Sequence, residues 1–250
     1  MLTFDEYGDG IGDAWTVIRD HANRVGPDAA VPTCPDWTVR DLVAHQGTVH
    51  RWAAATIRGL TVDIRAIEHE GLETVDQLDW FDLGARDLLQ ALVDTPEDMP
   101  GEFFLLDAPP PRLAWARRQC HETTIHAVDA MSASLGSAPL AASTWIKPQL
   151  AADGIDELLT GFLPRPRTKL RLPSALSLLV EATDINNAWT VQLGADAAVT
   201  TRGKVGDHDA VLTGTAVGLY LALWNRGEEI DASGAEVLGP WRELFKVVWR

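Results

Sequence analysis

Apolar residues recur at helical spacing along the first half of the chain, as they do in amphipathic helices that bury one face. This pattern predicts four helices, over residues 4–25, 38–59, 75–93 and 111–131. Each is roughly 15 to 22 residues long, a length that suits an antiparallel four-helix bundle. Proline-rich connections precede the second and the fourth helix and separate them from their neighbours.

The start of the second helix carries the clearest local signals in the chain. Thr38 is a candidate N-cap residue, and Asp41 at the third helical position completes a variant of the capping box. Trp37 before the cap and Leu42 after it have the spacing of a hydrophobic staple. The chain is therefore expected to enter this helix at a fixed angle.

The pattern changes after Gly136, where small and polar residues replace the long apolar stripes. Short runs with strand-like composition, broken by turn residues, alternate with short helical segments. The predicted elements are a helix at 151–162, strands at 175–183, 188–193 and 197–201, a helix at 213–224, a strand near 230–232 and a helix at 240–248. We therefore predict an α+β protein, with a helical domain over residues 1–160 and a small α+β domain over 161–250.

Composition and charge narrow the class of partner. The 250 residues are enough for one large or two smaller domains, and the net charge of −15 argues against binding to nucleic acid or to an anionic membrane. Two cysteines are too few for a disulfide framework. The first residues lack the basic and apolar pattern of a signal peptide, and no run of 18 apolar residues predicts a membrane span. A cytoplasmic protein is expected.

Candidate chemistry centres on the fourth helix. Glu122 and His126 are four residues apart and share a helix face, and Asp129 follows within the same turn. A carboxylate and an imidazole at this spacing form half of a metal site. The alternative is a surface ion pair, in which Arg118 simply pairs with Glu122.

A third ligand would have to come from another helix, because a catalytic zinc site usually has three protein ligands and one open position. His45 and His50 flank the apolar stripe of the second helix on opposite sides, so periodicity alone does not choose between them. Cys34 is either a thiolate or, more commonly, a small buried hydrophobic residue. The sequence has no HExxH, CxxC or glycine-rich phosphate motif, so metalloprotease and nucleotide-binding functions have no motif behind them.

Three segments carry a resemblance to a known family. VPTCPDWTVRDLVAHQGTVHRWAA, WARRQCHETTIHAVDAM and VLTGTAVGLYLALWNR occur in this order along the chain. Together they resemble the mycothiol-dependent maleylpyruvate isomerase family of actinobacteria. That resemblance implies a DinB-like N-terminal four-helix bundle followed by a C-terminal domain similar to sterol carrier protein.

The resemblance also implies a site. Its motifs place zinc, or another divalent metal, on His45, Glu122 and His126, and its active-site arginine corresponds to Arg226. Mycothiol is the implied thiol cosubstrate, and a small electrophilic molecule is the implied substrate. A metal-bound thiolate would add reversibly to an electron-poor alkene and so catalyse cis–trans isomerisation. The alternatives are a mycothiol S-transferase that keeps the adduct, and a non-catalytic ligand-binding protein on the same scaffold.

Overall fold

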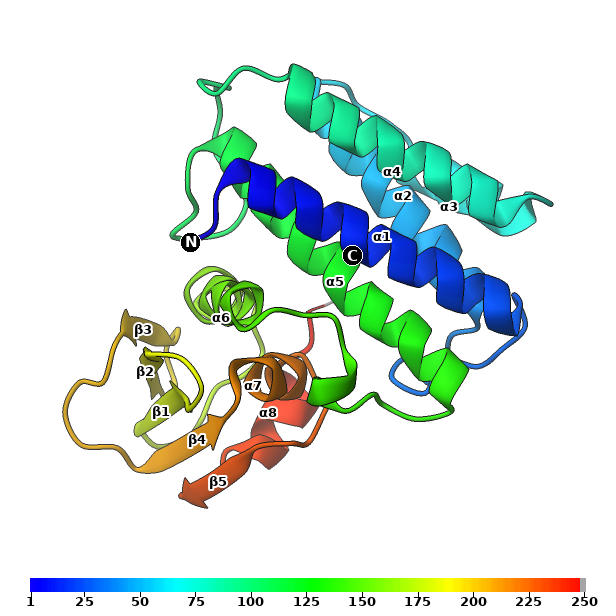
Figure 1. The fold of residues 1–250 in the computed structure, drawn as a ribbon. Coiled ribbons are helices and arrows are strands. Elements are labelled where there is room, and N and C mark those ends of the chain that lie inside the picture. The colour runs from blue at the N-terminus through cyan, green and yellow to red at the C-terminus, as the bar shows by residue number, and fades with distance from the viewer. Residues whose placement is uncertain (248–250) are drawn as a thin grey trace. The chain divides into compact units, whose positions relative to one another are not determined.

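The computed structural model describes residues 1–247, and its chain forms two compact units (Figure 1). The N-terminal unit comprises residues 2–103 and 109–139, and the C-terminal unit comprises residue 1, residues 104–108 and the described residues from 140 to 247. The division thus falls near residue 140 and not at the expected boundary of 160. The reason is that α6 (Pro148–Asp156) packs against a helix of the C-terminal unit, α7 (Ala216–Leu223), and belongs with it.

Four long helices build the N-terminal unit, as the apolar pattern predicts. They are α1 (Phe4–Val25), α2 (Val39–Ile57), α4 (Gln77–Asp94) and α5 (Pro111–Leu135). α1 packs along α5, and α2 packs against both α4 and α5 (Figure 1). The bundle followed by a small α+β unit confirms the predicted fold class.

The expected cap of α2 is present. The Thr38 side chain accepts a hydrogen bond from the Asp41 backbone N–H, and the Asp41 carboxylate accepts one from the Thr38 backbone N–H at 2.8 Å. Because the first N–H groups of a helix have no partner within the helix, this reciprocal pair fixes where α2 begins. The position of every side chain on α2 follows from that start.

A short helix, α3 (Ile64–Glu73), was not predicted. Its only buried residue is Gly71, so it lacks the apolar stripe on which the prediction depends. Asp63 caps α3 by accepting hydrogen bonds from the backbone N–H groups of Arg65 and Ala66. α3 is held in place by Trp80 of α4, whose indole Nε1 donates to Glu70 at 3.0 Å.

The C-terminal unit combines one sheet with short helices. After η1 (Ala141–Ser143) and α6, the chain makes a π-helical turn, η2 (Glu157–Phe162). The sheet has the order β3-β2-β1-β4-β5, in which β1 and β4 run parallel and the other neighbours run antiparallel. Its strands are β1 (Leu176–Ala182), β2 (Asn187–Leu193), β3 (Val199–Arg202), β4 (Ala210–Gly214) and β5 (Asp231–Gly234).

The sequence-based prediction missed β4 and began α7 too early. Thr213 lies opposite both Glu181 of β1 and Asp231 of β5, so its backbone belongs to the sheet. α7 begins only at Ala216, where the Thr215 side chain caps it. The apolar run continues unbroken from strand to helix, and periodicity therefore gave no boundary. The last helix, α8, spans Leu238–Leu244, and the predicted end at Val248 lies outside the described residues.

Within residues 1–247, every helix is too short or too polar to cross a lipid bilayer.

The Trp80 ring lies in a slot between Gly47 of α2 and Gly71 of α3, and the Arg51 guanidinium stacks on it at 3.7 Å from the ring centroid. A Cβ atom at Gly47 would overlap the ring. Gly47→Ala is expected to lower the free energy of unfolding by about 1–3 kcal/mol, because a packed core resists added volume. Urea unfolding followed by circular dichroism measures this.

Gly12→Ala is the matched control for this substitution. Gly12 is also a helical glycine, but nothing lies within 4 Å of the added Cβ. There alanine is expected to stabilise the protein by about 0.5–1 kcal/mol through its higher helix propensity. Equal effects at the two positions would contradict the described packing of Trp80.

Candidate metal centre

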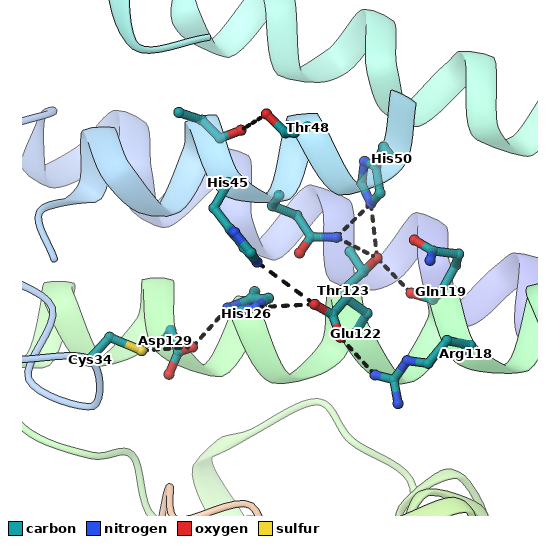
Figure 2. A network of polar contacts seen from close by, with 12 residues as sticks. Cys34, His45, Thr48, His50, Arg118, Gln119, Glu122, Thr123, His126 and Asp129 are labelled. Atoms are coloured by element: carbon teal, nitrogen blue, oxygen red, sulfur yellow. Dashed lines mark hydrogen bonds and ion pairs between the residues drawn. The ribbon is translucent and has the colours of Figure 1, made fainter. Parts of the chain in front are cut away.

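Three potential metal ligands from two helices converge within the bundle. His45 projects from α2, and Glu122 and His126 project from α5 (Figure 2). Glu122 Oε1 lies 3.8 Å from His45 Nε2 and 3.5 Å from His126 Nε2. Each residue offers one ligand atom, and these atoms all lie within 4.8 Å of one another. The cluster is thus a compact His₂Glu set.

The geometry of this cluster fits a divalent metal. Bonds of about 2.0–2.1 Å in a tetrahedral arrangement put ligand atoms about 3.3 Å apart, slightly closer than the distances here. Side-chain movements of about an ångström would bring the three atoms to bonding distance, and a fourth position would stay open. The donor set of two imidazoles and one carboxylate suits zinc, and also cobalt, nickel or iron.

Glu122 is held ionised and in one orientation. The Arg118 guanidinium, one turn earlier on α5, donates from Nη2 to Glu122 Oε2 at 2.9 Å, and both side chains are buried. Burial alone would raise the pKa of Glu122, but contacts with His126, His45 and Arg118 outweigh it and hold the pKa well below its ordinary value. Since Arg118 occupies Oε2, the other oxygen, Oε1, is the one that faces both histidines.

His126 is oriented by a fully buried carboxylate. Its Nδ1 lies 2.9 Å from Asp129 Oδ2, so Nδ1–H donates to Asp129 and Nε2 faces the cluster. Burial lowers the pKa of His126, yet the hydrogen bonds to Asp129 and Glu122 raise it overall to about 9. A carboxylate behind a histidine in this way fixes which ring nitrogen is available to a metal.

Trp37 covers the rings of both histidines. Its indole stacks on His126 with ring centroids 5.7 Å apart and an interplanar angle of 21°. It also meets the His45 ring at 4.9 Å. Burial lowers the pKa of His45, and the nearby Glu122 offsets this only partly, so the His45 ring is neutral at pH 7. From the sequence alone, Trp37 is assigned only to the hydrophobic staple. The pattern of a helix cap does not predict its ring contact with His45, eight residues later.

His50 lies apart from this cluster, deeper in the bundle. Its Nε2 contacts the Gln46 side-chain nitrogen at 2.8 Å and the Thr123 hydroxyl at 3.0 Å (Figure 2). Burial lowers the pKa of His50 to about 3, which keeps the ring neutral. The choice that periodicity left open therefore has a geometric answer: of the two histidines on α2, His45 is the one beside Glu122.

Cys34 and Arg226 lie in different units. The Cys34 thiol donates to Asp129 Oδ2 at 3.4 Å, the same oxygen that accepts from His126 Nδ1–H (Figure 2). Arg226 belongs to the C-terminal unit, where it follows α7 and donates from Nη1 to the Trp224 carbonyl at 2.9 Å. Asn225 before it has a positive φ of 61°, a conformation that ends the helix there. A catalytic role for Arg226 remains a prediction.

The fold and this cluster together define a class: a two-unit α+β protein whose helical bundle carries a His₂Glu set. The mycothiol maleylpyruvate isomerase N-terminal domain matches residues 11–131, and the C-terminal domain of the same family matches residues 149–249. These two matches span most of the chain. The protein therefore belongs to the mycothiol-dependent maleylpyruvate isomerase family, as the resemblance of its motifs indicated.

Two solved structures share this fold over nearly the whole chain. One is a crystal structure of the mycothiol-dependent maleylpyruvate isomerase, with a TM-score of 0.65 and 15% sequence identity. The other is a histidine-to-alanine mutant of that enzyme, with a TM-score of 0.63 and 14% identity. Each alignment covers 94% of this chain and 95% of the other chain. No curated protein sequence matches the chain.

The pKa of His126 predicts how metal affinity depends on pH. In the metal-free protein His126 is protonated at pH 7, because its pKa is about 9. A metal must displace the proton on His126 Nε2, while His126 Nδ1–H continues to donate to Asp129. The apparent zinc affinity is therefore expected to rise about tenfold per pH unit from pH 7 to 9 and to level off above.

Competition with a chromophoric chelator at pH 7, 8 and 9 measures this slope, after correction for the chelator's own protonation. Calorimetry at pH 7 in two buffers of different ionisation enthalpy counts the released protons independently. About one proton per metal is expected from this site. A flat affinity between pH 7 and 9, with no proton released, would contradict the raised pKa of His126.

Proposed function

We propose that this protein is a metal-dependent, mycothiol-using enzyme that catalyses cis–trans isomerisation of a small electrophilic alkene. The observation that carries the proposal is the cluster of His45, Glu122 and His126, brought together from two helices in a member of this family. A divalent metal held there, zinc first, would bind a thiol as its thiolate at neutral pH. A reduced thiol cosubstrate also suits a cytoplasmic location.

The side chains around the cluster support such a site. Arg118 balances the Glu122 charge and leaves Oε1 directed at the histidines. Asp129 holds the His126 ring with Nε2 toward the same point, and Trp37 limits the movement of both imidazoles. Such preorganisation keeps the three donors in place while the open position exchanges its occupant.

The reaction itself uses the cosubstrate's sulfur. The thiolate forms a C–S bond to one alkene carbon, and the π electrons move toward the conjugated carbonyl group. The former double bond is then single and rotates. When the electrons return, the C–S bond breaks, which leaves the trans alkene and the original thiolate. We assign to Arg226 the role of holding a substrate carboxylate, because a guanidinium binds carboxylates through two parallel hydrogen bonds.

An S-transferase on the same scaffold would differ only in the last step. There the carbanion takes a proton and the adduct is released, so thiol is consumed in proportion to product. A non-catalytic ligand-binding protein would show neither reaction. Membership of the isomerase family supports isomerisation as the leading proposal.

His45→Ala tests the ligand assignment. It leaves two of three ligand side chains, so the purified protein is expected to hold almost no metal, whereas the wild type holds about one equivalent after supply of zinc. Metal analysis by mass spectrometry measures this. His21→Ala is the control, because His21 lies outside the cluster and bonds Ser134 on another face of α5. Equal metal contents in the wild type and both variants would refute the assignment.

Product analysis tests the reaction. With mycothiol and a cis-enoyl diacid, the isomerase is expected to convert many equivalents of substrate while the free thiol concentration stays constant. Chromatography of the alkene isomers and a colorimetric thiol assay follow both quantities. Stoichiometric loss of thiol would establish the transferase instead, and no turnover despite thiol binding would establish a binding protein.

A further inference from the structure

The connection between α1 and α2 folds into a compact loop over residues 26–38, which we call the α1–α2 loop. Its backbone bonds to itself: Cys34 N–H donates to the Val31 carbonyl at 2.9 Å, and Trp37 N–H donates to the Cys34 carbonyl at 2.8 Å. Val31 N–H in turn donates to the Trp37 carbonyl at 3.0 Å. The residues between Val31 and Trp37 therefore have fixed positions.

This loop presents two donors to one buried carboxylate of α5. The Thr33 hydroxyl donates to Asp129 Oδ1 at 2.6 Å, and the Cys34 thiol donates to Asp129 Oδ2 at 3.4 Å. Ser132 Oγ lies 2.9 Å from the Thr33 hydroxyl. The 2.6 Å distance is that of a hydroxyl bonded to an ionised carboxylate, so the Thr33 contact is the stronger of the two loop contacts.

The two oxygens of Asp129 thus have different partners. Oδ1 accepts from Thr33, while Oδ2 accepts from His126 Nδ1–H. The carboxylate of an aspartate rotates easily about its last side-chain bond, because that torsion has a broad energy profile. A short hydrogen bond to Oδ1 sets this rotation, and the direction of Oδ2 follows. The plane of the His126 ring, and with it the direction of Nε2, then depends on Thr33.

We propose that Thr33 is a positioning residue for the metal bound by His45, Glu122 and His126. It acts through Asp129, which accepts from both the Thr33 hydroxyl and His126 Nδ1–H. Cys34 adds a weaker contact to the same carboxylate. This inference rests on the proposed function, since it supposes a metal at the cluster.

Metal affinity is the decisive measurement, because it requires neither mycothiol nor an alkene. Thr33→Val keeps the side-chain shape and removes the hydroxyl, whereas Thr33→Ser keeps the hydroxyl. Loss of a polar group that orients a metal ligand typically weakens metal binding by 10- to 100-fold. Thr33 contacts Asp129 and reaches the ligand His126 only through it, so the effect should lie at the lower end of this range. We expect about tenfold weaker zinc binding in Thr33→Val and near wild-type binding in Thr33→Ser.

Thr48→Val is the matched control. Thr48 is a buried threonine on α2 whose hydroxyl donates to its own helix, at the Ala44 carbonyl (Figure 2). Its removal is expected to change stability but not zinc affinity. Thermal unfolding of all variants in the presence of chelator reports the effect on the fold separately. The visible absorption of the cobalt-loaded proteins reports ligand geometry, and a changed band shape is expected only in Thr33→Val.

The outcomes separate the two proposals. If the wild type binds zinc and Thr33→Val binds it equally well with an unchanged cobalt spectrum, the role of Thr33 is refuted and the metal site stands. If Thr33→Val and Thr33→Ser lose affinity and melting temperature alike, the residue only packs, and the positioning role is again refuted. If the wild type itself binds no zinc, the proposed metal-dependent function falls, and the role of Thr33 falls with it.

Discussion

The interaction on which the N-terminal unit depends is the pairing of the buried Glu122 carboxylate. An isolated carboxylate in a helical core is strongly unfavourable, so the surrounding residues must supply opposite charge and hydrogen bonds. Arg118 from the same helix provides the charge, and His126 and His45 face the remaining oxygen. Removing Arg118 would take a hydrogen-bonded positive charge away from this buried anion, and removing Glu122 would take away the carboxylate that Arg118 Nη2 contacts at 2.9 Å.

This requirement explains the unusual character of α5. The helix is buried over most of its length, yet it has many polar residues, among them arginine, glutamine, histidine, threonine and aspartate. Each of the charged residues in the cluster is matched by a neighbour on α2, on α5 itself or in the α1–α2 loop. In successive turns, α5 thus has hydrogen-bonded polar pairs where a purely apolar core helix would have apolar packing.

Much of the fold could be predicted from the sequence, because the long helices bury one face and show it as an apolar stripe. The cap of α2 was predictable residue by residue, since Thr38 and Asp41 stand at fixed offsets. α3 was missed because its contact with the bundle runs through Trp80 and glycines rather than through apolar periodicity. β4 was missed because a strand and a helix followed each other within one apolar run.

The candidate site was only half predictable from periodicity. Glu122 and His126 stood out because they share one helix face, but His45 and His50 flanked the stripe symmetrically, and only the resemblance chose between them. The contacts of Thr33 and Trp37 could not be predicted, because they join loop residues to positions about ninety residues away. Such pairs depend on how two helices are placed in space, which local patterns do not encode.

The polar layer beneath the cluster has a consequence for how the helices fit together. Gln46 and His50 of α2 both contact Thr123 of α5, and Thr123 in turn donates to the Gln119 carbonyl. Sliding α2 along α5 by one helical turn, about 5.4 Å, would break all the contacts between the two helices in this layer and leave buried polar groups unpaired. Apolar side chains alone would tolerate such a slide more readily. The neutral His50, which lies outside the His45–Glu122–His126 cluster, thus helps to fix the register of α2 against α5 and keeps His45 beside Glu122.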